Sequence, residues 1–431
     1  MQGKALPGFR DFYPDDTALR NHIFATWRRV AARYGFEEYD GPPLEPLELY
    51  TQKSGAEIVG QLYHFTDKGE REVALRPEMT PTLARMVGAR AQALKKPIRW
   101  FSIPQLFRYE RQQRGRLREH FQLNMDIIGE AGPLADAELI AASIDIMRAL
   151  GLGPSDVRVR ISDRRVLQAL LLHAGVAKDQ LADAYWAIDK AERISRSELE
   201  KLLLAKFVVH AGPSVVDRIF EIAAIRGTAA LAQAVKQVTG GNEAAQALLE
   251  CCRALDSMGL GDFLEVDLGI VRGLAYYTGI VFELFDAGKS LRAICGGGRY
   301  DTLMKDIGGV DLPCVGFGMG DVVLGELLQE HRRPPAVASL GAFLVAVGGD
   351  DLPTVLKLAH ELRDHGVAVE YALKLQAIRK QLELAAARGT PRAVIIGPEE
   401  RQSGIAVVKN LVQGVESKVP MGELVTVLGG R

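Results

Sequence analysis

The feature that most restricts the fold is a change in the sequence pattern at residues 331–341. Its sequence, HRRPPAVASLG, sets two prolines before a run of small residues, which is typical of a linker. Beyond it, three apolar strand-like runs, the first at 342–347, alternate with two helical patterns, the first at 352–366. This alternation predicts a separate α/β domain at 342–431 with a mostly parallel sheet, which the run at 404–411 is expected to extend.

Before residue 331 the pattern of predicted helices and strands is different. After an early helix at 17–35, strand-like runs follow one another with turns rather than regular helices between them, which favours an antiparallel sheet. Residues 164–260 are rich in Ala, Leu, Lys and Glu and are predicted to form a helical insertion within the sheet region. We therefore expect an α+β domain made of residues 1–163 and 261–330. The strand-like runs lie at 72–80, 98–110, 117–129, 157–162, 271–285 and 292–298.

Length, charge and cysteine content narrow the class of protein. A chain of 431 residues is too long for one ordinary core. Its net charge of -1 argues against a general polyanion binder but permits a nucleic-acid partner held by one local patch. No apolar run reaches the roughly 18 to 20 residues of a membrane span, the first residues lack a signal-peptide pattern, and the four cysteines lack metal-binding CxxC spacing. A cytoplasmic protein that does not enter a membrane is expected.

Five arginines within residues 108–118 contrast with this near-neutral total. We expect two strands, 105–110 and 116–128, joined by the loop RQQRG, so that alternation places polar side chains on one face and apolar ones on the other, with Glu119 the one exception. An ordinary solvated sheet face is the simpler alternative, but Asn and Asp are poor strand residues, and arginine is used to the exclusion of lysine. Arginine's planar fork matches phosphate and carboxylate oxygens, so the hairpin is predicted to hold an anionic ligand, with its loop placed for a longer polyanion. The polar face comprises Arg116, Arg118, His120, Gln122, Asn124 and Asp126.

Three further stretches are weaker signals by themselves. VRGLAYYTG at 271–279 combines an arginine with two adjacent tyrosines, of which at most one is expected to line a pocket. CGGGRYD at 295–301 lets the backbone turn sharply or approach a ligand closely, and it matches neither a P-loop nor the dinucleotide fingerprint. Glu78 and Thr80 follow the end of a predicted strand, where polar groups often face a cleft. Each stretch also has an ordinary structural explanation.

Taken together, these stretches resemble the histidyl-tRNA synthetase family of class II aminoacyl-tRNA synthetases. The likeness extends over essentially the whole chain, in the family's order. It implies a class II catalytic domain, a helical insertion that contacts the tRNA acceptor arm, and a C-terminal anticodon-binding domain. The matching motifs are PGFRDFYP, PPLEPLELY (first class motif), LRPEMT, FRYERQQRGRLREHFQ (second class motif), VRGLAYYTG (the histidine signature), CGGGRYD and VGFGMGD (third class motif).

The resemblance also implies an activity. Members of the family activate L-histidine with ATP and Mg2+ to give histidyl-adenylate and pyrophosphate, and then transfer histidine to the 3' end of tRNA(His). Arg108 and Arg272 are the implied catalytic residues, and Gln113 and Arg114 the implied contacts to the tRNA acceptor end. Asp126, Tyr277 and the neighbouring Tyr276 are implied to read the imidazole, and no side chain is implied as a metal ligand. The remaining implied contacts are Arg108, Glu110, Arg116 and His120 to ATP, and Glu78, Thr80, Arg108, Gln122 and Arg272 to histidine.

Several positions depart from the usual family pattern. The third motif normally ends in a Glu-Arg pair whose arginine packs on adenine and meets the γ-phosphate, but this chain has Val322 and Val323 there. An unidentified cation, or magnesium alone, would have to meet that phosphate. The changes are similar to those of a branch that includes plant organelle-type enzymes. The other departures are Ala275 for Asp, Asp126 for Glu, and the order His120-Phe121, which is expected to put histidine against the adenine ring.

Two other functions remain open on the sequence. The regulatory subunit of ATP phosphoribosyltransferase shares this catalytic fold and senses histidine without charging tRNA, and loss of the third-motif arginine favours it. The domain after residue 340, which that subunit lacks, and the retained arginines favour the synthetase. An RNA sensor without ligase activity is the third possibility. The first class motif forms a subunit contact in class II enzymes, so a homodimer is expected.

Overall fold

The computed structural model describes residues 3–51, 59–111, 113–191, 194–206, 213–271, 277–288, 291–331 and 340–429. The chain divides into two compact units, Met1–Pro335 and Ala336–Arg431.

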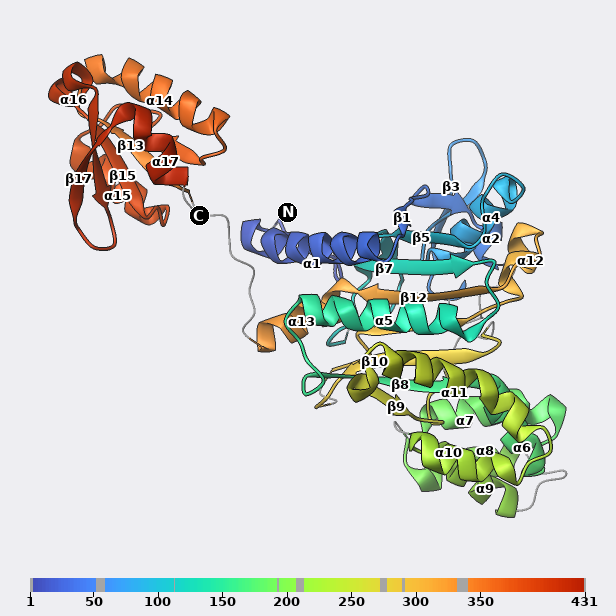
Figure 1. Ribbon diagram of the computed structural model, residues 1–431. Helices are drawn as coiled ribbons and strands as arrows, with labels where there is room; N and C mark the ends of the chain where they lie inside the picture. Colours follow the sequence, from blue (N-terminus) through green and yellow to red (C-terminus); the bar gives the residue numbers. More distant parts are fainter. Residues whose placement is uncertain are drawn as a thin grey trace. The chain divides into compact units, whose positions relative to one another are not determined.

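Unit 1 is built on a nine-stranded sheet (Figure 1). Neighbouring strands are antiparallel except for the outer pairs β1–β5 and β8–β9, which are parallel. The prediction of a largely antiparallel sheet is therefore confirmed. In spatial order the strands are β1 (Glu37–Glu38), β5 (Ile98–Ser102), β7 (Glu119–Ile128), β12 (Cys314–Gly320), β11 (Cys295–Arg299), β10 (Ile280–Asp286), β8 (Val157–Asp163) and β9 (Leu264–Val266), with β6 (Gln105–Phe107) paired to β7.

Helices cover one face of this sheet. Figure 1 shows α1 (Pro14–Arg33) and α5 (Pro133–Ala149) lying along β7 and β12. Trp27 of α1 and Ile144 of α5 are buried in one core with Met125 and Phe317 of the sheet. The prediction of turns rather than regular helices between these strands is wrong at α5. The helix is apolar on nearly all sides, with most of its residues buried, so it lacks the polar stripe that reveals a helix by periodicity.

The opposite face is only partly covered. The helices α4 (Thr80–Arg90) and α12 (Leu303–Gly308) pack there against Ile98, Ile128 and Val281. The segment before α4 forms a small three-stranded sheet, in which β4 (Glu72–Leu75) lies between β2 (Leu44–Pro46) and β3 (Tyr63–Thr66). The part of this face that these elements leave open carries the site described below.

Residues 164–260 are helical in the described part, as expected. The last of these helices, α11 (Gly241–Ser257), packs against α5 and α6. Cys251 and Leu255 of α11 join the main core of the unit, so the helical segment is anchored to the sheet region by apolar packing. No helix in the described ranges is both long and apolar enough to cross a membrane. The other helices are α6 (Arg164–His173), η1 (Lys178–Gln180), α7 (Leu181–Lys190), α8 (Arg196–Lys206), α9 (Pro213–Ala223) and α10 (Gly227–Lys236).

Unit 2 is a five-stranded sheet in the order β14-β13-β15-β16-β17 with helices packed on it. The parallel arrangement holds for β14, β13 and β15, but β16 and β17 run antiparallel to their neighbours. The prediction of a mostly parallel sheet is therefore wrong for its second half. A parallel crossover needs a dozen or more residues, and the segment 397–404 between β15 and β16 is shorter than that. The elements are β13 (Ala342–Ala346), α14 (Leu352–Asp364), β14 (Val369–Tyr371), α15 (Ile378–Ala387), β15 (Arg392–Ile396), α16 (Pro398–Ser403), β16 (Ile405–Asn410), β17 (Glu416–Pro420) and α17 (Leu424–Gly429).

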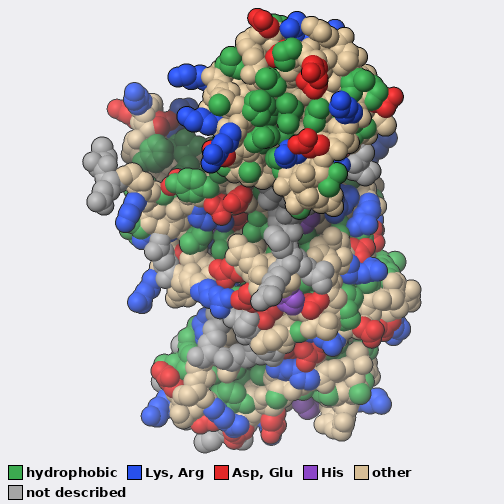
Figure 2. Space-filling model, turned by 90° about the vertical axis from the view of Figure 1, so that its left-hand side faces the viewer, with side chains coloured by type: hydrophobic (Ala, Val, Ile, Leu, Met, Phe, Trp, Pro, Cys, Tyr) green, Lys and Arg blue, Asp and Glu red, His purple; other side chains and the backbone are tan. Residues whose placement is uncertain are grey.

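Charge is spread rather than concentrated over the face that Figure 2 shows. Basic and acidic side chains are interspersed there, which fits the near-neutral total. Any polyanion bound on this face would be held by local contacts rather than by one broad positive surface.

Candidate active site

The arginine-rich hairpin is shorter in regular structure than predicted. Pairing of β6 with β7 ends at Phe107 and Glu119. Beyond that pair, Arg108 N donates to Arg118 O over 2.9 Å, and a single bridge joins Gln113 to Arg116. The described part of residues 108–118 is therefore a long loop, and the alternation proposed for the second strand holds only from Glu119 onward.

A floor of glycines lies under the open face of the sheet. The residues Asn124, Gly318, Gly296 and Glu283 stand opposite one another on β7, β12, β11 and β10. The next row contains Asp126, Gly316 and Gly298. A Cβ atom on Gly318 would overlap the Gln122 amide, and one on Gly316 would overlap the Asp126 carboxylate. The missing side chains let polar groups of β7 lie across the neighbouring strand, which is the close backbone approach that the glycine-rich motif suggested.

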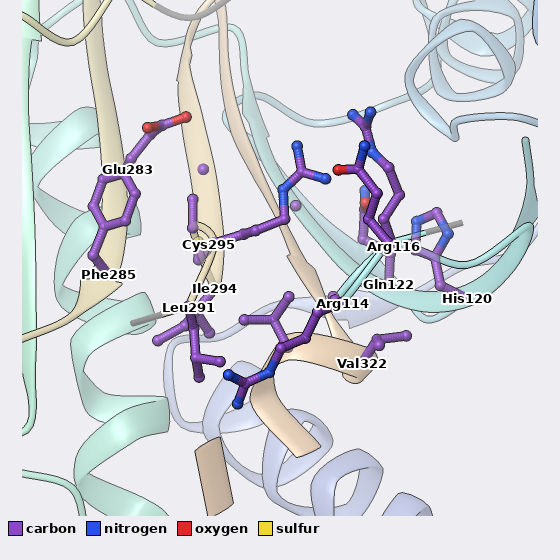
Figure 3. A pocket seen from close by; sticks show the side chains of 18 of the residues that line it. Arg114, Arg116, His120, Gln122, Glu283, Phe285, Leu291, Ile294, Cys295 and Val322 are labelled. Carbon is purple, nitrogen blue, oxygen red and sulfur yellow. The ribbon is translucent and has the colours of Figure 1, made fainter. Parts of the chain in front are cut away.

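A cavity of about 870 Å³ opens above this floor. Figure 3 shows Arg116, His120 and Gln122 on one side of it and Glu283, Phe285 and Cys295 on the other. Its volume falls within the range of sites that hold a nucleotide-sized ligand. Seven residues predicted from the sequence line it: Arg108, Glu110, Gln113, Arg114, Arg116, His120 and Gln122.

Two arginines of the cavity are held in place by neighbouring groups. Arg108 Nε donates to the carbonyl oxygen of Pro77 over 2.8 Å, which connects it to the segment that contains Glu78 and leads into α4. Arg116 is ion-paired with the buried carboxylate of Glu110. Both guanidinium groups are thus oriented before any ligand arrives, which lowers the entropic cost of binding an anion.

His120 is electrically neutral at physiological pH. Burial and the positive charge of Arg108 lower the pKa of its imidazole to about 3. Phe121 points to the other face of the sheet, where its ring lies 5.1 Å from that of Phe24, centroid to centroid. The inverted order of these residues therefore places the imidazole in the cavity and the phenyl ring in the core.

A second polar group lies one row further along the sheet. Asp126 is buried and accepts a hydrogen bond from the Tyr300 hydroxyl. Burial raises the pKa of Asp126 to about 7, and the tyrosine bond only partly offsets this effect. Tyr277 is also buried, and its ring lies against Gly298 in the same row. Asp126, Tyr277 and Tyr300 are thus brought together, and Tyr300 was not singled out from the sequence.

The remaining predicted site residues either do not line the cavity or lie outside the described part of the chain. Glu78 is buried and Thr80 begins α4, and both follow Pro77, whose carbonyl accepts from Arg108, within three residues in the sequence. Neither lines the cavity itself, and nor do Asp126 and Tyr277. Arg272 and Tyr276 lie outside the described residues.

Glu119, the acidic residue that breaks the polar and apolar alternation of β7, has a structural explanation that the sequence did not reveal. Glu119 is buried on the core-facing side, where its Oε1 accepts from Arg10 Nε over 2.6 Å. Arg10 also binds Asp321 at 2.9 Å, and Asp321 accepts from the backbone N–H of Phe121 at 2.9 Å. This network ties three of the recognised motifs to one another. The break in alternation at Glu119 was the only signal of it in the sequence.

The tip of the arginine loop is held by helix α13 (Asp321–Glu330). Arg114 is ion-paired with Glu330 and lies 3.3 Å from Glu326 Oε2, and Gly115 N donates to Glu326 at 3.2 Å. Arg114 remains 61% exposed, so these contacts add little stability but give the loop a preferred position.

A mostly antiparallel sheet with a glycine floor, crossed at one end by a loop of arginines, defines the catalytic domain of a class II aminoacyl-tRNA synthetase. The family model described as "Histidyl-tRNA synthetase" matches residues 8–320, and the model described as "Anticodon binding domain" matches residues 342–431. The chain belongs to the histidyl-tRNA synthetase family.

Individual relatives agree with this assignment. The histidine--tRNA ligase of Opitutus terrae is 46% identical over 424 residues, covering 97% of this chain and 96% of its own. The chloroplastic/mitochondrial histidine--tRNA ligase of Arabidopsis thaliana is 39% identical over 418 residues, covering 97% of this chain and 85% of its own. Among solved structures, histidyl-tRNA synthetase from Nostoc sp. PCC 7120 superposes with a TM-score of 0.85 at 25% identity, over 100% of this chain and 99% of its own.

Proposed function

We propose that this protein is a histidine--tRNA ligase. It activates L-histidine with ATP to give histidyl-adenylate and pyrophosphate, and then transfers the histidyl group to the 3' end of tRNA(His). The observation that carries the proposal is the cavity in which the loop arginines face a glycine floor, within a chain whose relatives are histidine--tRNA ligases.

The first reaction needs positioning more than proton transfer. A carboxylate oxygen of histidine attacks the α-phosphorus of ATP, the bond from that phosphorus to the bridging oxygen breaks, and pyrophosphate leaves with the electron pair. The carboxylate is already ionised, so no general base is required. Arg108 and Arg272 are proposed to hold the α-phosphate and the substrate carboxylate, bringing two anions together and stabilising the charge that develops.

The nucleotide is proposed to lie along the loop side of the cavity. Arg116 and Glu110, already paired with each other, contact the ATP phosphate and base regions. His120 packs against the adenine ring, for which a neutral imidazole is suited because it stacks without bringing another cation. The low pKa means that this contact does not change with pH in the physiological range.

Substrate histidine is proposed to be recognised by the buried polar residues around Asp126. Glu78, Thr80 and Gln122 hold its amino group and backbone, and Asp126 and Tyr277, with Tyr276 nearby, face its imidazole nitrogens. A site whose buried groups need hydrogen bonds rejects apolar amino acids, because these would leave the groups unpaired. Tyr300 is proposed to orient Asp126 through its hydroxyl.

Magnesium is the proposed cofactor and enters with ATP. Mg2+ commonly binds one or two carboxylates together with phosphate oxygens and water. The described residues contain no cluster of three or more acidic, His or Cys side chains that could hold a metal alone, so they fit an ion that the phosphates carry. Glu283, which lines the cavity from β10, is the proposed protein ligand. The bound ion would neutralise phosphate charge.

The tRNA is proposed to contact both units. Gln113 and Arg114 meet the acceptor end, the helical segment 164–260 contacts the acceptor arm, and residues 342–431 bind the anticodon. The catalytic domain would then consist of 1–163 and 261–330, with 331–341 as a linker. We also propose a homodimer that forms through the first class motif, and a cytoplasmic location.

Pyrophosphate exchange tests this function. Purified protein should exchange labelled pyrophosphate into ATP only when histidine is present, and should esterify histidine to tRNA(His). A folded protein that binds histidine but catalyses neither reaction would point to a regulatory role instead. The match of an anticodon-binding domain to 342–431 disfavours that role, because the regulatory subunit of ATP phosphoribosyltransferase lacks such a domain.

A further inference from the structure

One position of the nucleotide site lacks the residue type expected there. The third class motif ordinarily supplies an arginine to the outer phosphate, and this chain has Val322 and Val323. Both valines line the cavity at the start of α13. They add apolar surface where a negatively charged triphosphate has to be accommodated.

Arg292 brings a positive charge to the part of the cavity wall that contains Val323. Arg292, which precedes β11, also lines the cavity. A Cβ atom placed on Gly115 would lie 3.7 Å from Arg292 Cδ and 3.1 Å from Val323 Cγ2. Arg292, Val323 and the tip of the arginine loop therefore meet at one point of the cavity wall.

The backbone around Arg292 is fixed by the sheet. Leu291 N donates to Asp286 Oδ1 over 3.0 Å, and Ile294 N donates to Leu284 O over 2.8 Å. Gly320 N, at the end of β12, donates to Ile294 O over 3.3 Å. Arg292 is thus held in register with the strand that leads into Val322. In Figure 3, Leu291, which precedes Arg292, and Ile294, two residues after it, lie across the cavity from His120 and Gln122.

The other described arginines of the cavity have different positions. Arg108 and Arg116 belong to the start and end of the loop, and Arg114 at its tip is engaged by Glu326 and Glu330. A triphosphate that meets Arg108 at its α-phosphate needs a further cation beyond it to hold its outer charge. A guanidinium fork binds phosphate oxygens bidentately.

We propose that Arg292 binds the outer phosphates of ATP, in the role that a third-motif arginine has elsewhere in the family. This inference rests on the proposed function for the identity of the nucleotide. Leaving pyrophosphate would remain in contact with Arg292, whereas AMP and the adenylate, which lack the β- and γ-phosphates, would not reach it.

Calorimetric titration of ATP and of AMP, without histidine, tests the inference. Arg292→Ala should weaken binding of Mg-ATP by about 10-fold or more, as expected for loss of a charge-assisted contact, and change binding of AMP by less than about twofold. Arg292→Lys, which keeps the charge but loses the fork, should be intermediate. Lys305→Ala removes an exposed cation outside the cavity and should leave both affinities unchanged.

The results separate this inference from the function itself. Equal affinity of wild type and Arg292→Ala for ATP would overturn the inference, and so would an equal loss for ATP and AMP, which a structural role would cause. Histidine-dependent exchange by the wild-type protein is a separate measurement. Its absence would sink the proposed ligase function, while the ratio of ATP to AMP affinity would still decide the role of Arg292.

Discussion

Replacement of Asp126 by Asn should make unit 1 more stable at neutral pH while weakening recognition of histidine. The carboxyl group is buried, and its pKa rises from 3.8 to about 7 on folding. Between these values the folded protein retains a proton that the unfolded chain has lost. The free energy of unfolding therefore falls as pH rises through this window, and the cost is fully present above pH 7.

The magnitude follows from the shift. One pKa unit corresponds to about 1.4 kcal/mol, so the raised pKa of Asp126 lowers the free energy of unfolding by about 2 kcal/mol at pH 5 and about 4 kcal/mol at pH 8. An amide carries no charge and can still accept from the Tyr300 hydroxyl. Asp126→Asn should therefore gain up to these amounts, with about 2 kcal/mol more stabilisation at pH 8 than at pH 5.

Urea unfolding followed by tryptophan fluorescence measures this difference. All three tryptophans, Trp27, Trp100 and Trp186, belong to unit 1, so the signal reports that unit without interference from the other. A gain that is the same at pH 5 and pH 8, or a loss of stability at pH 8, would refute the assignment of a buried carboxyl group whose pKa is raised on folding. In the exchange assay, the KM for histidine should rise by about 10-fold or more, because the imidazole loses an anionic partner.

Asp136 provides the matched control. Asp136 is buried as well, but it is ion-paired with Arg299, which is also buried and stabilises the ionised carboxylate. Asp136→Asn removes the nearer of that guanidinium's two carboxylate partners and leaves Asp301 at 3.4 Å, so it should destabilise unit 1 by about 1–3 kcal/mol at pH 8. The same chemical change is thus expected to act in opposite directions at the two positions.

Three further variants test other parts of the site. Arg10→Ala removes the cation paired with the buried carboxylates of Glu119 and Asp321, and should cost about 3–5 kcal/mol in the same unfolding assay. Arg28→Ala, whose ion pair is exposed, is the control and should cost less than about 1 kcal/mol. Equal losses for the two variants would contradict the network. Gly316→Ala puts a methyl group onto the Asp126 carboxylate and should cost about 1–3 kcal/mol, whereas Gly320→Ala has open space and should cost little. Arg114→Ala should leave histidine-dependent exchange within about twofold while slowing single-turnover transfer to tRNA by about 10-fold; a parallel loss in both steps would remove Arg114 from the tRNA contact.

Local patterns in the sequence predicted much of the fold. Alternation along residues 119–127 correctly separated the cavity face from the core face, because side chains of a strand point to opposite sides whatever surrounds them. The strand-helix alternation after residue 341 correctly indicated most elements of unit 2. It did not reveal that β16 and β17 are antiparallel, because strand direction depends on how far the preceding connection can reach.

Residue types and their order in the chain, read without coordinates, determined the kind of site: arginines for phosphate, a loop for a long anion, and glycines where the backbone must be approached. Only the tertiary structure brought Arg292 beside Val323 and Asp126 beside Tyr300, and placed Arg10 between Glu119 and Asp321. These neighbours are far apart in sequence and meet through strand register and core packing. The physical reason is that burial and charge, which set the pKa of Asp126 and the strength of an ion pair, arise from contacts between distant segments that no local pattern records.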